Sequence, residues 1–232
     1  NEHELKETLP NFLVYGSYPE VLTAPTNKQK QELLIELANA YLLKDILALE
    51  HIKGSKYLTD LLKLLAFQIG KEVSFQELGR QLGLSVKTVQ RYVDLLEKAF
   101  VVIRVGGFSR NLRNEVVRKS KYYFFDTGLR NALIAQFNDI DHRSDVGELW
   151  ENFLFVERLK KRNYQEIYAN AYFWRTYEGQ EIDLIEEGGG AIRAYEFKWS
   201  QKDQPVPSQW REYYPDANYL TIHRENYLRF LL

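Results

Sequence analysis

The chain of 232 residues contains no cysteine and no methionine. The lack of cysteine excludes disulfide frameworks, thiol nucleophiles and cysteine-ligated zinc sites. The four histidines, His3, His51, His142 and His223, are scattered, and none has the spacing of metal ligands. The formal net charge of −1 excludes a uniformly basic surface, so any binding of nucleic acid must come from a local patch.

Two further absences concern location. The sequence has no apolar run of the about 18 residues that span a bilayer, and its N-terminus shows no signal-peptide pattern. We therefore expect a cytoplasmic protein with no membrane partner. The chain begins at Asn1 rather than at methionine, so we also expect it to be a fragment of a longer protein.

Hydrophobic residues make up 45% of the chain and charged residues 27%. This composition is typical of a globular protein that buries a sizeable core. The length allows one large domain or two small ones.

The strongest chemical signal is a pair of apolar runs joined by glycines, over residues 180–198. A two-residue turn at Gly189-Gly190 suits type I′ or II′ geometry, which needs positive φ. Counting outward from this turn sets Asp183 opposite Glu196, and opposed residues of an antiparallel pair share a face. Lys198 follows two residues later and joins them on that face. Two adjacent carboxylates repel each other unless a cation lies between them, and either an ammonium group or a divalent metal can serve.

Residues 1–54 are predicted to form a mainly helical segment. Thr26 is a candidate N-cap for a long helix from about residue 28 to residue 50, whose apolar residues follow the spacing of a buried stripe. Lys44 and Asp45, near its end, are either a solvated charged pair, which is the favoured interpretation, or functional residues.

A helix-turn-helix is predicted next, after a helix at residues 55–69. Ser74 and Glu77 have the spacing of a capping box, which starts a short helix. Gly83 ends that helix, and Ser85 caps a second one. Two helices joined by a tight glycine-containing turn are typical of a helix-turn-helix.

A wing is predicted to follow these helices. The strand at 101–105 and a glycine turn at 106–107 extend the helix-turn-helix, so that residues 55–121 form a winged helix-turn-helix. The remaining residues, 122–232, are assigned to a third domain.

The second helix offers an exposed face for DNA, because the N-terminal half of a recognition helix contacts base edges and phosphates. The predicted contacts on this helix are Lys87, Thr88, Gln90 and Arg91. Between residues 98 and 121, seven basic residues accompany one acidic residue, Glu115. The seven are Lys98, Arg104, Arg110, Arg113, Arg118, Lys119 and Lys121. This basic patch is expected to bind phosphates, and of its residues we add Arg110 and Arg113 to the predicted DNA contacts. The alternative is a protein-binding or spacer module with solvated charges.

The third domain is predicted to have an α/β or α+β core, because a helix rich in large apolar residues precedes several strands. The helix is expected at 148–162, and the strands at 166–168, 171–177 and 219–222 as well as in the hairpin. Before them, Asp126 is predicted to cap a helix rather than to act in catalysis. The polar stretch 138–145 is predicted to be a linker and a domain boundary.

Glu151 lies among the large apolar residues of that helix, where a carboxylate is costly without a partner. Two interpretations remain open. Glu151 either belongs to a charged rim with Arg158 or faces a sheet.

A glutamate on a helix, an aspartate on a strand and Glu-x-Lys on the next strand resemble the PD-(D/E)xK restriction-endonuclease-like fold, a mixed sheet with flanking helices. The resemblance implies that Asp183, Glu196 and Glu151 hold Mg²⁺ and that Lys198 is the catalytic lysine. Oxygen ligands suit this ion, which polarises a phosphoryl oxygen and activates water. Ile182 stands where the family has proline.

Several stretches together resemble the C-terminal region of prokaryotic AAA-family ATPases, which have a helical lid, a winged helix and an uncharacterised nuclease-like domain. These stretches are Tyr15–Glu20, Tyr41–Asp45, Lys121–Leu129, Gly147–Asn152, and Glu181–Asp183 with Glu196–Lys198. The resemblance implies that residues 1–54 are a lid remnant. Because the chain has no Gly-x-x-x-x-Gly-Lys-Ser/Thr motif, ATP is expected to bind only in a missing N-terminal domain.

Two functions follow from these resemblances. The first is a Mg²⁺-dependent endodeoxyribonuclease, to which the winged helix delivers DNA and which the chain's own ATPase domain regulates. The second is a non-catalytic module that binds DNA or a protein partner and keeps a degenerate nuclease fold, with Glu196 and Lys198 as an ordinary salt bridge.

Overall fold

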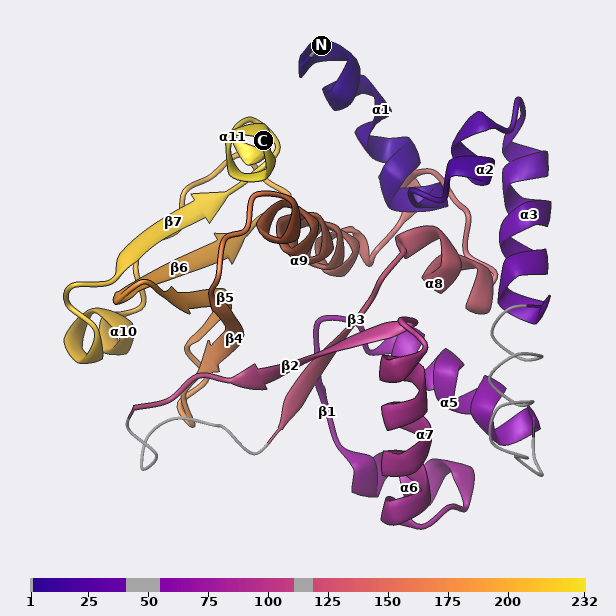
Figure 1. Ribbon diagram of the computed structural model, residues 1–232, viewed down its shortest axis with the longest axis horizontal. Coiled ribbons are helices and arrows are strands. Elements are labelled where there is room, and N and C mark those ends of the chain that lie inside the picture. Colours follow the sequence, from indigo (N-terminus) through magenta and orange to yellow (C-terminus); the bar gives the residue numbers. More distant parts are fainter. Residues whose placement is uncertain (1, 41–54, 111–118) are drawn as a thin grey trace. The chain divides into compact units, whose positions relative to one another are not determined.

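The computed structural model describes residues 2–40, 55–110 and 119–232 (Figure 1). The chain forms two compact units, Asn1–Arg104 with Tyr122–Ser144, and Val105–Lys121 with Asp145–Leu232. The boundary between residues 144 and 145 falls in the predicted polar linker. The units also divide between residues 121 and 122, but there the chain returns to the first unit, whereas the predicted third domain begins at that point. The predicted boundary at 54/55 lies inside the first unit.

The first unit begins with three helices, α1 (Glu2–Tyr15), α2 (Pro19–Thr23) and α3 (Asn27–Ala40). Thr26 starts α3 as predicted, because its Oγ1 accepts a hydrogen bond from the Gln29 N–H at 3.3 Å. The predicted helix is thus confirmed as far as Ala40. Lys44, Asp45 and the rest of that helix lie outside the described residues.

The turn between α1 and α2 is locked to α8 (Thr127–Leu133) through Asp126. Asp126 Oδ1 accepts from the Leu129 N–H at 2.9 Å, which confirms the predicted cap, and Oδ2 accepts from the Ser17 N–H at 2.6 Å. A Cβ on Gly16 would lie 2.0 Å from Asp126 Oδ1, and one on Gly128 would lie 2.2 Å from the Tyr15 carbonyl oxygen. Two of the stretches that carry the ATPase resemblance, Tyr15–Glu20 and Lys121–Leu129, therefore pack against each other.

The next elements of the first unit are α5 (Ser55–Phe67), β1 (Glu72–Val73), α6 (Phe75–Leu82) and α7 (Val86–Lys98), followed by β2 (Val102–Gly107) and β3 (Ser120–Phe124). β2 and β3 both cross into the second unit. The three strands are neighbours in the order β1-β3-β2. The predicted helix boundaries are confirmed by caps: the Ser74 and Ser85 side chains accept from Glu77 N and Thr88 N, and Gly83 is left-handed at φ 67°. A short 3₁₀ turn, Ile140–His142, follows α8.

The second unit is built on a mixed sheet in the order β2-β4-β5-β6-β7. Its further strands are β4 (Asn170–Arg175), β5 (Glu181–Gly188), β6 (Ala191–Phe197) and β7 (Asn218–Ile222), and its helices are α9 (Val146–Tyr164), α10 (Ser208–Tyr213) and α11 (Tyr227–Leu231). β2 pairs with β4 and β6 with β7 in parallel, whereas β4, β5 and β6 pair antiparallel. The predicted α/β (α+β) class and the mixed sheet with flanking helices are confirmed.

Helices cover both faces of this sheet. Ala194 packs in a core with Trp210 of α10, whereas the next residue, Tyr195, lies 4.8 Å from Phe230 of α11, measured between ring centroids. Successive residues of a strand point to opposite faces, so α10 and α11 lie on opposite sides of β6. α9 packs beside α11 (Figure 1).

Two local predictions were wrong. Gly106 and Gly107 do not form a turn, because both continue β2 and pair in parallel with Tyr172 and Phe173 of β4. Residues 166–168 are not a strand, because they close the end of α9. Glu166 has a φ of 53°, and the Ile167 N–H donates to the Arg162 carbonyl at 2.9 Å. None of the described helices is long and apolar enough to cross a bilayer.

Candidate functional site

The glycine hairpin of β5 and β6 has the predicted register. Gly188 pairs with Ala191 across Gly189-Gly190, whose φ values are 61° and 76°. Positive φ at both positions is the type I′ pattern. The ladder continues to the Leu184–Tyr195 pair, and Asp183 and Glu196 directly follow this last pair on their two strands.

Asp183 lies at an irregularity of β5. Tyr172 pairs with Ile185 and Trp174 with Ile182, so β5 has one more residue than β4 between these two pairs. Such a β-bulge re-aims the side chains beside it. Asp183 is buried, and its Oδ2 accepts a hydrogen bond from the Phe197 N–H of β6 at 2.8 Å.

Lys121 of β3 brings an ammonium group to these carboxylates. Its Nζ lies 3.0 Å from Glu151 Oε1 and 3.8 Å from Asp183 Oδ1, and its side chain is only 4% exposed. Burial alone would lower the pKa of Lys121, but the charges of Glu151 and Asp183 outweigh that effect and raise it. Assigning Lys121 to a phosphate-binding patch was therefore wrong.

A signal for Lys121 was available in its own strand. All five residues of β3 are buried, and the strand reads Ser-Lys-Tyr-Tyr-Phe. A lysine inside such an apolar run needs a carboxylate partner. The signal does not say which carboxylate, because Glu151 lies 30 residues further along the chain.

Glu196 is held by Lys198, whose Nζ lies 2.6 Å from Glu196 Oε1. The other oxygen, Oε2, is buried and has no hydrogen-bond partner among the residues that the structure describes. Burial, together with the negative charge of Asp183, raises the pKa of Glu196 to about 7 although Lys198 acts in the opposite direction.

Glu181 is a further acidic member that the sequence analysis did not single out. It is exposed, and its charge acts on Lys121, Glu196 and Lys198. We call the set of Lys121, Glu151, Glu181, Asp183, Glu196 and Lys198 the carboxylate cluster.

A divalent metal ion fits part of this cluster. Mg²⁺ usually binds proteins through one or two carboxylates, with water and substrate phosphates as its other ligands. Asp183 and Glu196 are such a pair, and the buried Glu196 Oε2 is the acceptor that they leave uncommitted among the described residues. Glu151 accepts a hydrogen bond from Lys121. In the described ranges, no group of three or more His, Cys, Asp or Glu side chains is arranged to hold a metal ion, so the protein would supply two carboxylates and no third side chain of these types.

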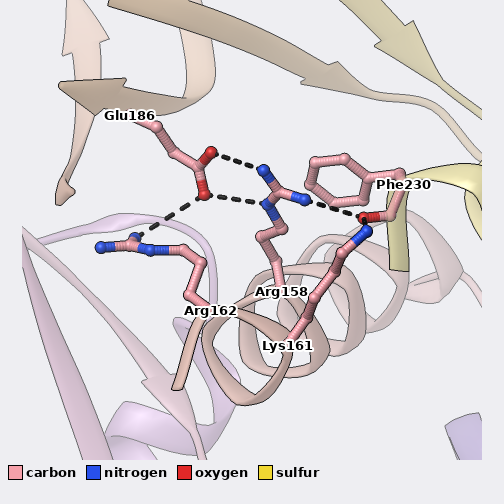
Figure 2. Close-up of polar contacts among 5 residues, drawn as sticks. All are labelled: Arg158, Lys161, Arg162, Glu186 and Phe230. Carbon is pink, nitrogen blue, oxygen red and sulfur yellow. Dashed lines mark hydrogen bonds and ion pairs between the residues drawn. The ribbon is translucent and has the colours of Figure 1, made fainter. Parts of the chain in front are cut away.

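A second charged network joins Arg158, Lys161 and Arg162 to Glu186 and Phe230 (Figure 2). Arg158 of α9 donates to both carboxylate oxygens of Glu186 at 2.9 and 2.8 Å, and Arg162 lies 3.7 Å from the same group. Arg158 also donates to the Phe230 carbonyl at 2.9 Å, as does Lys161 at 3.3 Å. The interpretation that paired Glu151 with Arg158 was therefore wrong.

This network and the cluster share two elements. Arg158 follows Glu151 by seven residues, or about two turns of α9. Glu186 follows Asp183 by three residues on β5. The Arg158–Glu186 pair therefore joins α9 to β5, the two elements that also carry Glu151 and Asp183.

The predicted DNA contacts divide between the two units. Lys87, Gln90 and Arg91 are exposed on α7 in the first unit, whereas the Thr88 Oγ1 lies 2.8 Å from Ser85 Oγ in the helix cap.

Arg110 belongs to the second unit. Its guanidinium lies 2.6 Å from Glu187, and its backbone N–H donates to the Tyr214 hydroxyl at 3.0 Å. Arg113 lies outside the described residues.

Three uncharacterized proteins illustrate the relatives of this chain. A protein of Mycobacterium tuberculosis is 26% identical over 186 residues, a match that covers 79% of this chain and 41% of that relative. A protein of Haemophilus influenzae is 24% identical over 223 residues, a match that covers 94% of this chain and 50% of that relative. A protein of Methanocaldococcus jannaschii is 23% identical over 187 residues, a match that covers 78% of this chain and 40% of that relative. The chain thus spans half or less of the length of these relatives.

Two family models match the chain, and no solved structure does. Residues 146–223 match a domain of unknown function (DUF4143), which is found in C-terminal regions associated with AAA ATPases. Residues 6–140 match a domain of unknown function (DUF8612). Because this second match covers more than half of the 232 residues, the chain belongs to the DUF8612 family.

Proposed function

We propose that this chain is the C-terminal part of a cytoplasmic AAA-family ATPase, in which a DNA-binding winged helix is coupled to a Mg²⁺-dependent endonuclease-like domain. The observation that carries the proposal is the position of Asp183 and Glu196 beside the end of the hairpin ladder, where the charge of Asp183 acts on Glu196 and Lys198 contacts one oxygen of Glu196. The greater length of the relatives supports a further domain, which we propose to be the ATPase that binds ATP.

Each residue of the pair has a distinct task in this proposal. Asp183 and Glu196 would hold Mg²⁺, and the Phe197 N–H fixes one oxygen of Asp183 for that purpose. Bound Mg²⁺ supplies Lewis acidity toward a phosphoryl oxygen and lowers the pKa of a coordinated water. Lys198 is 38% exposed, so its ammonium group borders solvent and can orient the attacking water or balance charge on the phosphate.

The winged-helix part of the proposal rests on the first unit. The succession of α5, β1, α6, α7, β2 and β3, with the strand order β1-β3-β2, supports a winged helix. α7 would be the recognition helix, because Lys87, Gln90 and Arg91 lie exposed in its N-terminal half.

One observation favours the second candidate, a non-catalytic DNA- or protein-binding module. Lys121 already supplies a cation to Glu151 and Asp183, and Lys198 supplies one to Glu196. A cluster balanced in this way can persist as a buried structural network without metal and without turnover.

Plasmid nicking by the full-length protein separates the two candidates. We expect nicking with Mg²⁺ and none with EDTA. Asp183→Asn should lower the rate by roughly 100-fold or more, because several kcal/mol of transition-state stabilisation depend on the metal. The matched control is Glu157→Gln, an acid of α9 that pairs with Lys160 outside the cluster. Equal nicking by all three proteins would reject the nuclease, and DNA binding without nicking would favour the module.

A further inference from the structure

Lys121 enters the carboxylate cluster from a strand of its own, and its position is fixed from three sides. Its Nζ lies 3.0 Å from Glu151 Oε1, 3.8 Å from Asp183 Oδ1 and 5.6 Å from the centroid of the Phe173 ring. The residue is 3% exposed. An ammonium group held in this way is part of the packed interior.

The charges of the cluster set how many further cations it can accept. Four carboxylates and two ammonium groups act on one another, which leaves two negative charges when all six groups are ionised. One divalent ion balances that remainder, whereas a second would leave two excess positive charges. Without the ammonium group of Lys121 the remainder is three negative charges, and a second divalent ion would then leave only one excess positive charge. The buried Glu196 Oε2, for which the described part of the chain offers no hydrogen-bond donor, marks the side on which this one ion fits.

We propose that Lys121 is the resident cation of the cluster. Its ammonium group lies between Glu151 and Asp183, in the place that a second divalent ion would otherwise take. The native site then admits one ion, on Asp183 and Glu196. This inference rests on the proposed function for the role of that one ion. Lys121 is a positioning residue in this scheme, since it holds Glu151 and Asp183 together without touching substrate.

The scheme has a chemical consequence. Two-metal sites place one ion at the attacking oxygen and one at the leaving oxygen of a phosphodiester. Here a fixed ammonium group replaces one of those ions. The ammonium group of a lysine carries one positive charge and belongs to the chain itself. The position between Glu151 and Asp183 is therefore occupied by a cation at any metal concentration.

The number of Mn²⁺ ions bound per chain tests the proposal, with isothermal titration calorimetry and the electron paramagnetic resonance of free Mn²⁺ as readouts. The full-length protein is compared with Lys121→Gln, which removes the cation, and with Lys121→Arg, which keeps a positive charge. We expect Lys121→Gln to bind one more Mn²⁺ ion than the parent and Lys121→Arg to bind the same number as the parent. A folded Lys121→Gln protein that gains no ion overturns the proposal.

A second measurement covers the case in which Lys121→Gln does not fold, since it leaves buried carboxylates uncompensated. Crystals of the unmodified protein are soaked in MnCl₂, and the ion is located by its anomalous scattering. We expect Lys121 Nζ to stay beside Glu151 while any Mn²⁺ lies on Glu196. Mn²⁺ bound to Glu151, with Lys121 displaced, overturns the proposal.

Failure of this inference and failure of the proposed function give different results. A parent protein that nicks DNA, with a Lys121→Gln variant that gains no ion, rejects the resident cation and leaves the nuclease standing. A parent protein that binds no Mn²⁺ and does not nick, with a Lys121→Gln variant that binds one ion, rejects the nuclease and supports the resident cation.

Discussion

Without a bound metal ion, the surroundings of Glu196 act in opposite directions on its ionised form. Its side chain is 9% exposed and faces the like charge of Asp183, which penalises the ionised form. Lys198 offsets only part of this penalty, because it contacts one of the two oxygens. Keeping a carboxylate in such a place costs stability, which is the usual situation of a residue retained for binding.

The raised pKa of Glu196 predicts how stability changes with pH. Between its ordinary value of 4.5 and about 7, the folded protein binds a proton that the unfolded chain does not bind. The stability contributed by that proton is present in full at the lower pH and is lost as the pH rises through 7. Glu196→Gln removes this loss. In EDTA, the free energy of unfolding of this variant, taken relative to that of the parent, should therefore rise by up to about 3 kcal/mol from pH 5 to pH 8. Urea unfolding at both pH values measures the difference.

A variant that changes no charge serves as the control for this measurement. Thr221 lies opposite Glu196 on β7, and its Oγ1 accepts from the Gln204 N–H at 2.9 Å. Thr221→Val should therefore destabilise the protein by the same amount at pH 5 and at pH 8. If Glu196→Gln also shows a constant difference, the carboxyl group does not titrate in this range.

At the scale of single residues, the sequence predicts what a local rule controls. The register of the hairpin from Gly188–Ala191 to Leu184–Tyr195 was predictable, because two glycines with positive φ fix it. The role of Lys121 was not predictable. Its partner Glu151 is 30 residues away, and only the tertiary structure brings the two side chains together.

At the scale of elements, the Arg158–Glu186 pair links α9, β5 and α11, and it predicts a strong energetic coupling. Arg158→Met should cost about 3–5 kcal/mol, because Glu186 is 1% exposed and would keep a buried charge without its main partner. Adding Glu186→Gln should recover part of that loss, with a coupling of at least about 1 kcal/mol in a double-mutant cycle. The free energy of unfolding in urea is the measurement.

Another ion pair on the same helix provides the comparison for this cycle. Lys160 and Glu157 lie 2.5 Å apart but are 36% and 28% exposed. Their coupling should stay within about 0.5 kcal/mol, as expected for a pair near solvent. Additive effects of the Arg158 and Glu186 substitutions would show that the buried pair does not hold these elements together.

Element boundaries were predictable where a cap or a turn marks them and not where tertiary pairing decides. Ser74 and Ser85 cap their helices as expected. Gly106 and Gly107 look like a turn in sequence but form a strand, because β4 offers them a parallel partner more than 60 residues later. Tertiary pairing of this kind overrides local preference.

At the scale of the whole molecule, the two family matches and the two units agree on where the chain divides. The matched segments end at 140 and begin at 146, and the units divide between 144 and 145. The polar stretch 138–145 predicted a boundary at this place. It could not show that residues 105–121 cluster with the later unit and residues 122–144 with the earlier one. The first of these assignments depends on the pairing of β2 with β4 and of Lys121 with Glu151.

DNA binding by α7 predicts a change in salt dependence. In the full-length protein, Lys87→Ala with Arg91→Ala should weaken binding to a duplex and reduce the slope of log K against log salt by roughly 2, because each phosphate contact contributes about 0.9. The charge-matched control is Lys202→Ala with Arg211→Ala, two exposed basic residues of the second unit. Fluorescence anisotropy at several salt concentrations measures both slopes. Equal slopes in the two double variants would mean that α7 contributes only net charge, and the first unit would then be better explained as a protein-binding module.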